Sequence, residues 1–194
     1  MKKLAIAILT VPERIDKYAE LIRDLNSQIR HGGLEKHVQL VTIGDSKEML
    51  VGDKREVWKH LVRAENVMWC DDDDKYKPGA IALVYKACCF GADVVTFCGD
   101  YIEADTGQRG DFIIRKGFKN EDDWTKRIFK RAPNHLCAVK TELARQCVFP
   151  SLNVSEDSEY ARQINKLIKT EVHLNEKIYE YHYSSMNSLT ANRL

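Results

Sequence analysis

The sequence predicts an α/β fold. It should be a single domain with a mainly parallel central sheet flanked by helices and a small antiparallel second sheet. The chain has 194 residues, the size of one domain at about 150 residues per domain. Apolar residues make up 44% of it and charged residues 30%, as in ordinary globular proteins. Short apolar runs alternate with helical patterns along the first half, which favours parallel strands joined by helices.

The composition excludes several classes of protein. The 30 Lys and Arg residues balance 29 Asp and Glu residues, whereas dedicated nucleic-acid binders usually carry a strong basic excess. No apolar run approaches the roughly 18 residues of a membrane-spanning helix, so we expect no integral membrane segment. Residues 4–11 follow two lysines, as in a secretory signal, but Pro12 and two charged residues come directly after them. We therefore expect a buried strand at this position.

The six cysteines predict a reduced chain in the cytoplasm. No pair of them shows the Cys-x-x-Cys spacing of zinc or redox motifs, and most lie inside apolar runs. Cysteine in such surroundings behaves as a small hydrophobic residue. We therefore expect no zinc site and no disulfide framework.

Strands and helices alternate in the first half. Residues 4–9 form a continuous apolar run, which is typical of a central parallel strand. After Pro12, apolar residues recur at helical spacing as far as Ile29, and His31-Gly32-Gly33 ends this helix. The same patterns predict a strand at 38–43, a helix around 57–62, a strand at 67–70, a helix from Pro78 to Cys88 and a strand at 93–98.

The second half has a less regular pattern. Residues 101–103 and 112–114 predict a hairpin around Asp105-Thr106-Gly107, which begins the antiparallel part. Residues 115–135 are polar, basic and aromatic, without periodicity. The remaining expectations are a strand at 136–139, a short helix capped by Thr141, a helix at 160–168 and closing strands at 172–174 and 178–183.

Four consecutive aspartates, Asp71 to Asp74, carry the strongest chemical signal. Adjacent carboxylates repel one another unless a cation or water relieves them. They follow a buried strand, and open α/β sheets bind ligands at the carboxyl ends of their strands. If the segment is extended, Asp71 and Asp73 lie on one side and can share a divalent ion, while Asp72 and Asp74 face away. A solvated acidic loop is the structural alternative.

Spacing excludes three other kinds of ion or phosphate site. An EF-hand starting at Asp71 needs an oxygen ligand, a glycine and a glutamate where the chain has Lys75, Tyr76 and Ala82. The phosphate loop G-x-x-x-x-G-K-[ST] is absent, and so is the dinucleotide fingerprint G-x-G-x-x-G after the first strand. An ion-dependent site without a glycine loop remains.

Four short sequence blocks occur in a characteristic order within about residues 4–170. They are Leu9-Thr10-Val11-Pro12-Glu13-Arg14, Gly44-Asp45-Ser46, Trp69-Cys70-Asp71-Asp72-Asp73-Asp74 with Pro78, and Ser155-Glu156-Asp157-Ser158. Together they resemble the GT-A glycosyltransferases, specifically the inverting type of family 2. The third block is similar to the D-x-D segment, with Asp71 and Asp73 as the matching pair. The fourth is similar to the "ED" motif, whose second acid is the family's catalytic base.

The resemblance implies a metal-dependent inverting transferase, which moves a sugar from a nucleotide-diphosphate sugar, a UDP-sugar first, to an acceptor hydroxyl. The nucleotide-sugar half would be about residues 1–100 and the acceptor half about residues 101–194. Mn²⁺ or Mg²⁺ on Asp71 and Asp73 would neutralise the leaving diphosphate. Asp157 would be the general base, with Glu156 as the second candidate. The residues expected to bind the donor are Thr10, Pro12, Arg14, Asp45, Arg55, Asp71 and Asp72.

His182 is a further candidate for the metal. Tyrosines alternate onto one face of residues 178–183 and leave Glu180 and His182 on the other. Some enzymes of the family place a histidine near the C-terminus on the metal. A solvent-facing histidine explains the same pattern.

The acceptor candidates are Asn134, His135 and Trp124. The first two lie where the family often contacts acceptor or diphosphate. Trp124 lies in the stretch 109–131, which holds eight basic residues, four acidic residues and four aromatic ones. Such a stretch can bind a glycan, a lipid-linked sugar or a modified nucleic acid. A solvated surface over a few core aromatics explains it as well.

Two other functions fit the same residues. A non-catalytic sugar-nucleotide or glycan-binding protein could retain the fold without turnover. A sugar-nucleotide nucleotidyltransferase also uses metal-bound aspartates on an α/β sheet. Those enzymes typically carry a glycine-rich basic loop after the first strand, and residues 10–14 contain no glycine.

Overall fold

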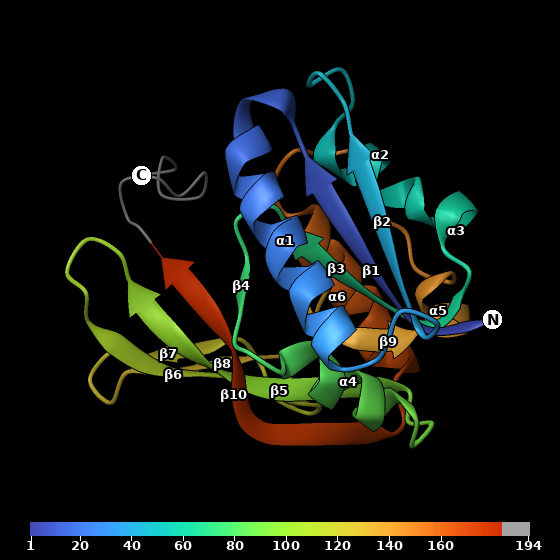
Figure 1. The fold of residues 1–194 in the computed structure, drawn as a ribbon. Coiled ribbons are helices and arrows are strands. Elements are labelled where there is room, and N and C mark those ends of the chain that lie inside the picture. Colours follow the sequence, from blue (N-terminus) through green and yellow to red (C-terminus); the bar gives the residue numbers. More distant parts are fainter. Residues whose placement is uncertain (184–194) are drawn as a thin grey trace.

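The structure is a computed structural model that describes residues 1–183. Within these residues, all ten strands belong to one hydrogen-bonded sheet with helices on both faces (Figure 1). The strand order along the main path is β2-β1-β3-β9-β5-β6-β8-β7, and β10 and β4 pair off this path. The predicted fold class is confirmed: a mixed α/β domain with a large, mostly parallel central sheet flanked by helices.

The centre of the sheet is built from apolar parallel strands. β1 (Lys2–Thr10) lies between β2 (Val38–Gly44) and β3 (Ala64–Asp71) and pairs in parallel with both. Parallel strands are covered on both faces and so need continuous apolar runs, which is why the sequence pattern located them. Leu9 is in register with Asp71, so β1 and β3 end at the same edge of the sheet.

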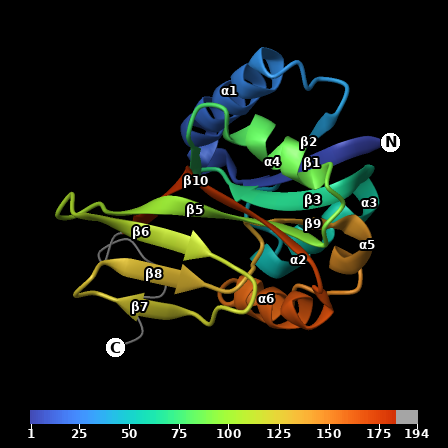
Figure 2. The same cartoon turned by 90° about the horizontal axis from the view of Figure 1, so that it is seen from below.

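The helices form two layers, which Figure 2 shows on either side of the sheet. α1 (Ile15–His31) and α4 (Ala80–Cys88) cover one face, and α5 (Thr141–Ala144) and α6 (Glu156–Leu167) cover the other. Where one helix was predicted at 57–62, the chain forms two short ones, α2 (Val51–Glu56) and α3 (Trp58–Leu61). A turn of 3-10 helix, η1 (Pro12–Arg14), joins β1 to α1.

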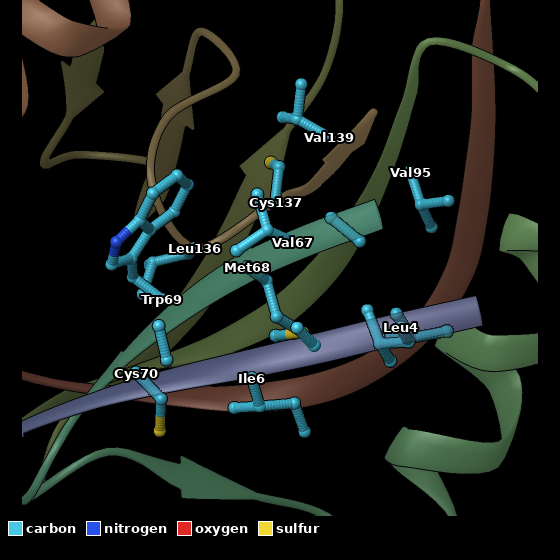
Figure 3. Close-up of a cluster of buried hydrophobic side chains, with 14 of the residues drawn as sticks. Leu4, Ile6, Val67, Met68, Trp69, Cys70, Val95, Leu136, Cys137 and Val139 are labelled. Atoms are coloured by element: carbon cyan, nitrogen blue, oxygen red, sulfur yellow. The ribbon is translucent and has the colours of Figure 1, made fainter. Parts of the chain in front are cut away.

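The core on the α5–α6 side is largely aromatic. The Trp69 ring of β3 lies 5.2 Å from Trp58 and from Phe149, and 5.0 Å from Tyr160 of α6. Figure 3 shows Trp69 projecting from β3 beside Leu136. All four aromatic rings are at most 2% exposed. This packing fixes the start of α6 near the end of β3.

The second half continues the same sheet in mainly antiparallel fashion. β5 (Val94–Glu103) pairs antiparallel with β6 (Arg109–Ile114) and with β9 (Ala138–Lys140), which joins it to β3. β8 (Ile128–Arg131) extends β6, and β7 (Glu121–Asp123) forms the outer edge. The expected antiparallel part is therefore present as an extension of the central sheet.

The last strand of the described residues, β10, pairs with two other strands. β10 (Glu171–Tyr183) pairs in parallel with β5 and, at Tyr179 and Glu180, antiparallel with β4 (Lys75–Tyr76). Shifts in the β5–β10 register, between Leu174 and Lys177 and between Lys177 and Tyr179, mark a bulge. The strands predicted at 172–174 and 178–183 are therefore one strand interrupted by that bulge.

Three other local expectations are corrected. Residues 93–98 and 101–103 belong to one strand, β5, and the stretch 115–135 contains β7 and β8. Strands of three or four residues are too short to show periodicity. Thr141 does not cap α5, because Lys140 is the N-cap residue and the buried Thr141 hydroxyl has no hydrogen-bond partner among the described residues. No helix within residues 1–183 is long and apolar enough to cross a membrane.

Candidate active site

A groove of about 820 Å³ opens at the carboxyl end of β3. It is bounded by α1, by the segment after β3, by the start of α6 and by the end of β10. The sequence-predicted residues that line it are Asp71, Asp72, Asp73, Asp74, His135, Asp157 and His182. The fold thus brings residues more than a hundred positions apart to one place.

The four aspartates form a tight turn. The Asp74 N–H donates to the Asp71 carbonyl at 3.0 Å, and the Asp71 N–H donates to the Asp74 carboxylate at 2.8 Å. The segment is therefore not extended, and the expectation that alternate side chains share a side is wrong here. All four carboxylates nevertheless line the groove.

Asp71 is held by a buried arginine. Its Oδ1 lies 3.0 Å from Nη2 of Arg55 on α2. Partial burial favours the neutral acid, but Arg55, and to a smaller extent His135 and Arg14, hold the pKa of Asp71 below its ordinary value. The carboxylate is therefore ionised and lies at the wall of the groove.

Asp72 and Asp73 share one arginine. Arg14, at the end of η1, lies 2.7 Å from the Asp72 carboxylate and also contacts that of Asp73. Asp72 is only 2% exposed, and its burial raises its pKa. Asp73 is 47% exposed and also lies 3.6 Å from Lys17 of α1. Asp72 is therefore not solvated, and Asp73 is the most exposed of the four aspartates.

The pKa of Asp74 is raised well above its ordinary value of 3.8. The Tyr179 hydroxyl of β10 donates to its carboxylate. Burial, and next to it the charge of Asp71, raise the pKa of Asp74 to about 7. A cation bound beside Asp71 and Asp74 would reduce the repulsion between the two carboxylates.

The "ED" block opens α6 as expected. Ser155 has a positive φ of 70°, and Glu156 is the first residue of the helix. Glu156 is 5% exposed and turns away from the groove toward Arg55, with 3.2 Å between Oε1 and Nε. Asp157 is 41% exposed and lines the groove, so of the two acids it is the one placed to meet an acceptor.

His135 stands beside Asp157. Its Nδ1 lies 3.8 Å from the Asp157 carboxylate and has no hydrogen-bond partner among the described residues. Burial, and then the charge of Arg55, lower the pKa of His135 to about 4, so the ring is neutral at pH 7. His135 lines the groove, and its contact with an acceptor stays a prediction.

The face pattern predicted for the last strand is present. Tyr179 is buried, whereas His182 is exposed, lines the groove and lies 3.1 Å from Glu180. His182 and the aspartate turn therefore share one groove.

The remaining donor candidates lie around Lys54 of α2. Lys54 is 5% exposed, pairs with Asp45 and donates to the Thr10 carbonyl at 3.3 Å. The other oxygen of Asp45 accepts the Met49 N–H at 2.7 Å, so this carboxylate fixes a loop. Pro12 opens η1 beside them.

The other two acceptor candidates, Asn134 and Trp124, make contacts within the fold. The Asn134 side chain accepts the Leu136 N–H at 3.0 Å within a turn. Trp124 is 50% exposed but packs edge-on against Phe129 at 5.0 Å and Tyr101 at 6.0 Å, and it does not line the groove. Its predicted role in acceptor binding stays a prediction.

The side chains of the aspartate turn offer the kind of ligand atom that a hard divalent cation binds. Carboxylate oxygens are the ligands that Mg²⁺ and Mn²⁺ prefer. Burial, and next to it the charge of Asp71, raise the pKa of Asp74, so a cation bound beside these two acids would favour the ionised form of Asp74. Among residues 1–183, no three His, Cys, Asp or Glu side chains are already grouped as a closed metal site. A bound ion would therefore complete its coordination with donor phosphates or water.

Sequence reasoning missed Lys17 and Tyr179 in this region, and it did not predict that Lys54 is buried. A buried lysine has no local signature, because its burial depends on Asp45, a partner from another element. Lys17 and Tyr179 lie on faces that do follow from helix and strand periodicity, but only the topology shows that these faces meet the aspartates.

No family model matches the sequence, and no curated protein matches it either. Solved structures of TarS from S. aureus do match its fold. Its fragment 1–349 aligns with 93% of this chain and 60% of that one, at a TM-score of 0.61 and 16% identity. The complex of that fragment with UDP-GlcNAc aligns with 99% of this chain and 61% of that one, at a TM-score of 0.62 and 14% identity. The complex with UDP aligns with 94% of this chain and 61% of that one, also at a TM-score of 0.62 and 14% identity.

This chain therefore spans about three fifths of the TarS fragment it matches. At these identities the likeness concerns the fold alone. The chain shares the α/β fold of this TarS fragment.

Proposed function

We propose that the chain is a metal-dependent, inverting glycosyltransferase that moves a sugar from a UDP-sugar to an acceptor hydroxyl. One observation carries the proposal: the aspartate turn after β3 and Asp157 at the start of α6 line the same groove. A transferase needs both an anion-neutralising site and a base around one space. The UDP and UDP-GlcNAc complexes of TarS, a protein of similar fold, support a uridine nucleotide as the donor.

Asp71 and Asp73 hold the Mn²⁺ or Mg²⁺ ion in this proposal, and His182 faces the same space. The ion supplies positive charge that neutralises the diphosphate as it leaves. Arg14 and Lys17, which contact Asp73, are the cations nearest to that position and available to phosphate oxygens. Arg55 is too buried for this role and instead orients Asp71.

Asp157 acts as the general base. It takes the proton of the acceptor hydroxyl while that oxygen attacks the anomeric carbon. The bond between that carbon and the diphosphate oxygen breaks, and UDP leaves with the electron pair. A single displacement of this kind inverts the anomeric centre. Neutral His135, 3.8 Å from Asp157, can accept or donate a hydrogen bond to the acceptor without competing as a cation.

A glycan hydroxyl is the acceptor we favour. Six of the eight basic residues in the stretch 109–131 lie within 4.0 Å of an acidic side chain. Ion pairs between β7 and β8, such as Lys130–Glu121 and Arg131–Asp122, account for two of them. The stretch is therefore largely charge-balanced, which favours an uncharged acceptor over a nucleic acid or another polyanion.

The test compares wild type with Asp157→Asn, using UDP-sugars with Mn²⁺ and a panel of glycan, lipid-linked and nucleic-acid acceptors. We expect unchanged donor binding by calorimetry and turnover lowered at least about a hundredfold. Glu142→Gln, an exposed acid on α5, is the matched control and should behave as wild type. Near-normal turnover in Asp157→Asn would move the base elsewhere. Metal-dependent UDP-sugar binding without any transfer or hydrolysis in wild type would make the chain a binding protein.

A further inference from the structure

A second pocket opens at the opposite edge of the sheet from the groove. Its volume is about 410 Å³, within the range of about 300–1,000 Å³ that is usual for small-molecule sites. Ala64, which begins β3, lines this pocket, whereas Asp71, which ends β3, lines the groove, so the two sites lie about 23 Å apart along one strand. Figure 1 shows the N-terminus and α5 together at this edge. None of the described residues lines both sites, so they are separate.

The inner wall of this second pocket is apolar. Val62, Ala64 and Cys88 line it, and each is at most 3% exposed. Thr141 lines it as well, and its buried hydroxyl has no hydrogen-bond partner within residues 1–183. Such a wall favours a ligand with an apolar part over a fully hydrated ion, and a ligand oxygen would satisfy the Thr141 hydroxyl.

Two exposed arginines converge at the rim of the second pocket. Arg63 Nη1 donates to the Val62 carbonyl oxygen at 3.0 Å, and Arg145 Nη2 donates to the same oxygen at 3.3 Å. The Arg145 guanidinium also lies over the Trp58 ring, with its Cζ atom 5.6 Å from the ring centroid. A guanidinium has five N–H donors, so these bonds leave most donors of both groups for a ligand.

Among the described residues, neither guanidinium has a carboxylate within 4.0 Å. Glu142 precedes Arg145 by about one helical turn, but Arg145 turns to the Val62 carbonyl instead and the Glu142 carboxylate stays exposed. The other charged residues that line the pocket are already paired, Glu65 with Lys3 and Lys140 with Asp93. Two neighbouring positive charges repel each other, and an anion bound between them would reduce that repulsion.

We propose that this second pocket binds a small amphipathic anion. The carboxylate or phosphate of the ligand bonds to Arg63 and Arg145, and its apolar part lies against Val62, Ala64 and Cys88. Guanidinium groups suit either oxyanion, because their planar fork offers two parallel N–H donors to two oxygens. The site uses neither a metal nor a nucleotide, so it does not depend on the transferase function proposed for the groove.

Anilinonaphthalene sulfonate (ANS) is the probe for this site, because it is an aromatic anion whose fluorescence rises in apolar surroundings. Titrated without nucleotide or divalent metal, wild type should bind ANS at one saturable site. Benzoate and phenyl phosphate should each displace the dye. Benzyl alcohol, which has the same ring without the charge, should not displace it at the same concentrations. The more effective of the two anions identifies the group that the arginines prefer.

Substitutions locate the bound dye. Arg63→Gln and Arg145→Gln should each weaken ANS binding about tenfold, because each removes a charge-assisted hydrogen bond. Arg162→Gln is the matched control, since Arg162 is an exposed arginine of α6 that pairs with Glu159 and lines neither site. It removes the same charge and should bind ANS as wild type does. Arg14→Gln, beside the aspartate turn, should also leave ANS binding unchanged.

The Tm of each variant without ligand establishes that it folds. Four results would each overturn the proposal: no ANS binding by wild type, unchanged affinity in Arg63→Gln and Arg145→Gln, an equal loss in Arg162→Gln, or equal displacement by benzyl alcohol. A loss confined to Arg14→Gln would place the anion in the groove and overturn it as well. The assay contains neither a UDP-sugar nor Mn²⁺, so its failure would leave the proposed transferase function untouched.

Discussion

Arg55 and Asp71 form an ion pair, Nη2 to Oδ1 at 3.0 Å, that joins α2 to the carboxyl end of β3. The same guanidinium donates through Nε to Glu156, the first residue of α6, at 3.2 Å. Arg55 is 3% exposed and Glu156 5%. One buried cation thus ties the strand end that bears the aspartates to the helix that bears Asp157.

Removing that cation should destabilise the fold. Arg55→Met leaves Glu156 buried without its partner and Asp71 without its main counter-charge, and breaking a buried pair of this kind costs about 3–5 kcal/mol. Urea unfolding at pH 7 measures the loss. The double variant Arg55→Met/Glu156→Gln should recover part of it, because it removes the stranded charge. A loss in the single variant below about 1 kcal/mol, the value of an exposed pair, would contradict this role.

Asp74 should make stability fall as pH rises toward neutral. Its pKa is about 7 in the folded chain against an ordinary 3.8, so the folded state binds more protons between these values. The contribution is fully present below about pH 4 and is lost as pH rises through about 7. Asp74→Asn lacks this proton, so its stability relative to wild type should increase on the order of 2–4 kcal/mol from pH 4.5 to 8.

Urea unfolding without divalent metal follows this difference across the pH range. Asp93→Asn is the control, because the backbone N–H groups of Thr170 and Lys169 hold the pKa of Asp93 at about 2 despite some burial. That carboxylate stays ionised from pH 4.5 upward, so the effect of its substitution should not vary over the range. An Asp74→Asn difference that is equally flat would contradict the unrelieved charge at Asp74.

Asp73 should be required for metal-dependent nucleotide binding. It is an accessible acid of the turn, and Asp73→Ala removes a proposed oxygen ligand while leaving Arg14 paired with Asp72. We expect calorimetry to detect Mn²⁺-dependent UDP binding in wild type and none in Asp73→Ala. Unchanged affinity would remove Asp73 from the proposed metal ligands.

Gly52 should not tolerate a side chain. A Cβ atom there would lie 1.7 Å from the Pro150 carbonyl oxygen, a backbone atom that cannot turn away. Gly52→Ala should therefore displace the segment leading to α6 and lower the Tm by several degrees or more. Gly44→Ala is the milder comparison, because its Cβ would meet the Thr10 methyl group at 3.2 Å. Equal Tm values for the two variants would contradict the close approach at Gly52.

The sequence predicted the parts of the fold that depend on local pattern. β1 and β3 are buried on both faces, so each appears in the sequence as a continuous apolar run. The helix before His31 buries one face, so its apolar residues recur at helical spacing. The position of Asp71 at a strand end and of Asp157 at a helix start followed from the same elements. The roles assigned to both acids stay predictions.

What the sequence did not predict depends on contacts between distant segments. Lys54 and Arg55 look like the solvated start of a helix, and only Asp45, Asp71 and Glu156 explain their burial. The tight turn of the aspartates depends on backbone hydrogen bonds that four identical side chains do not encode.

The outermost strand, β7, consists of Glu121, Asp122 and Asp123. A sheet edge presents unpaired backbone groups to which a strand from another molecule can add. Three consecutive acids at that edge would face the same three acids of an approaching copy, and their mutual repulsion opposes such addition. The acids that balance the charge of β8 therefore also guard the domain against aggregation through its open edge.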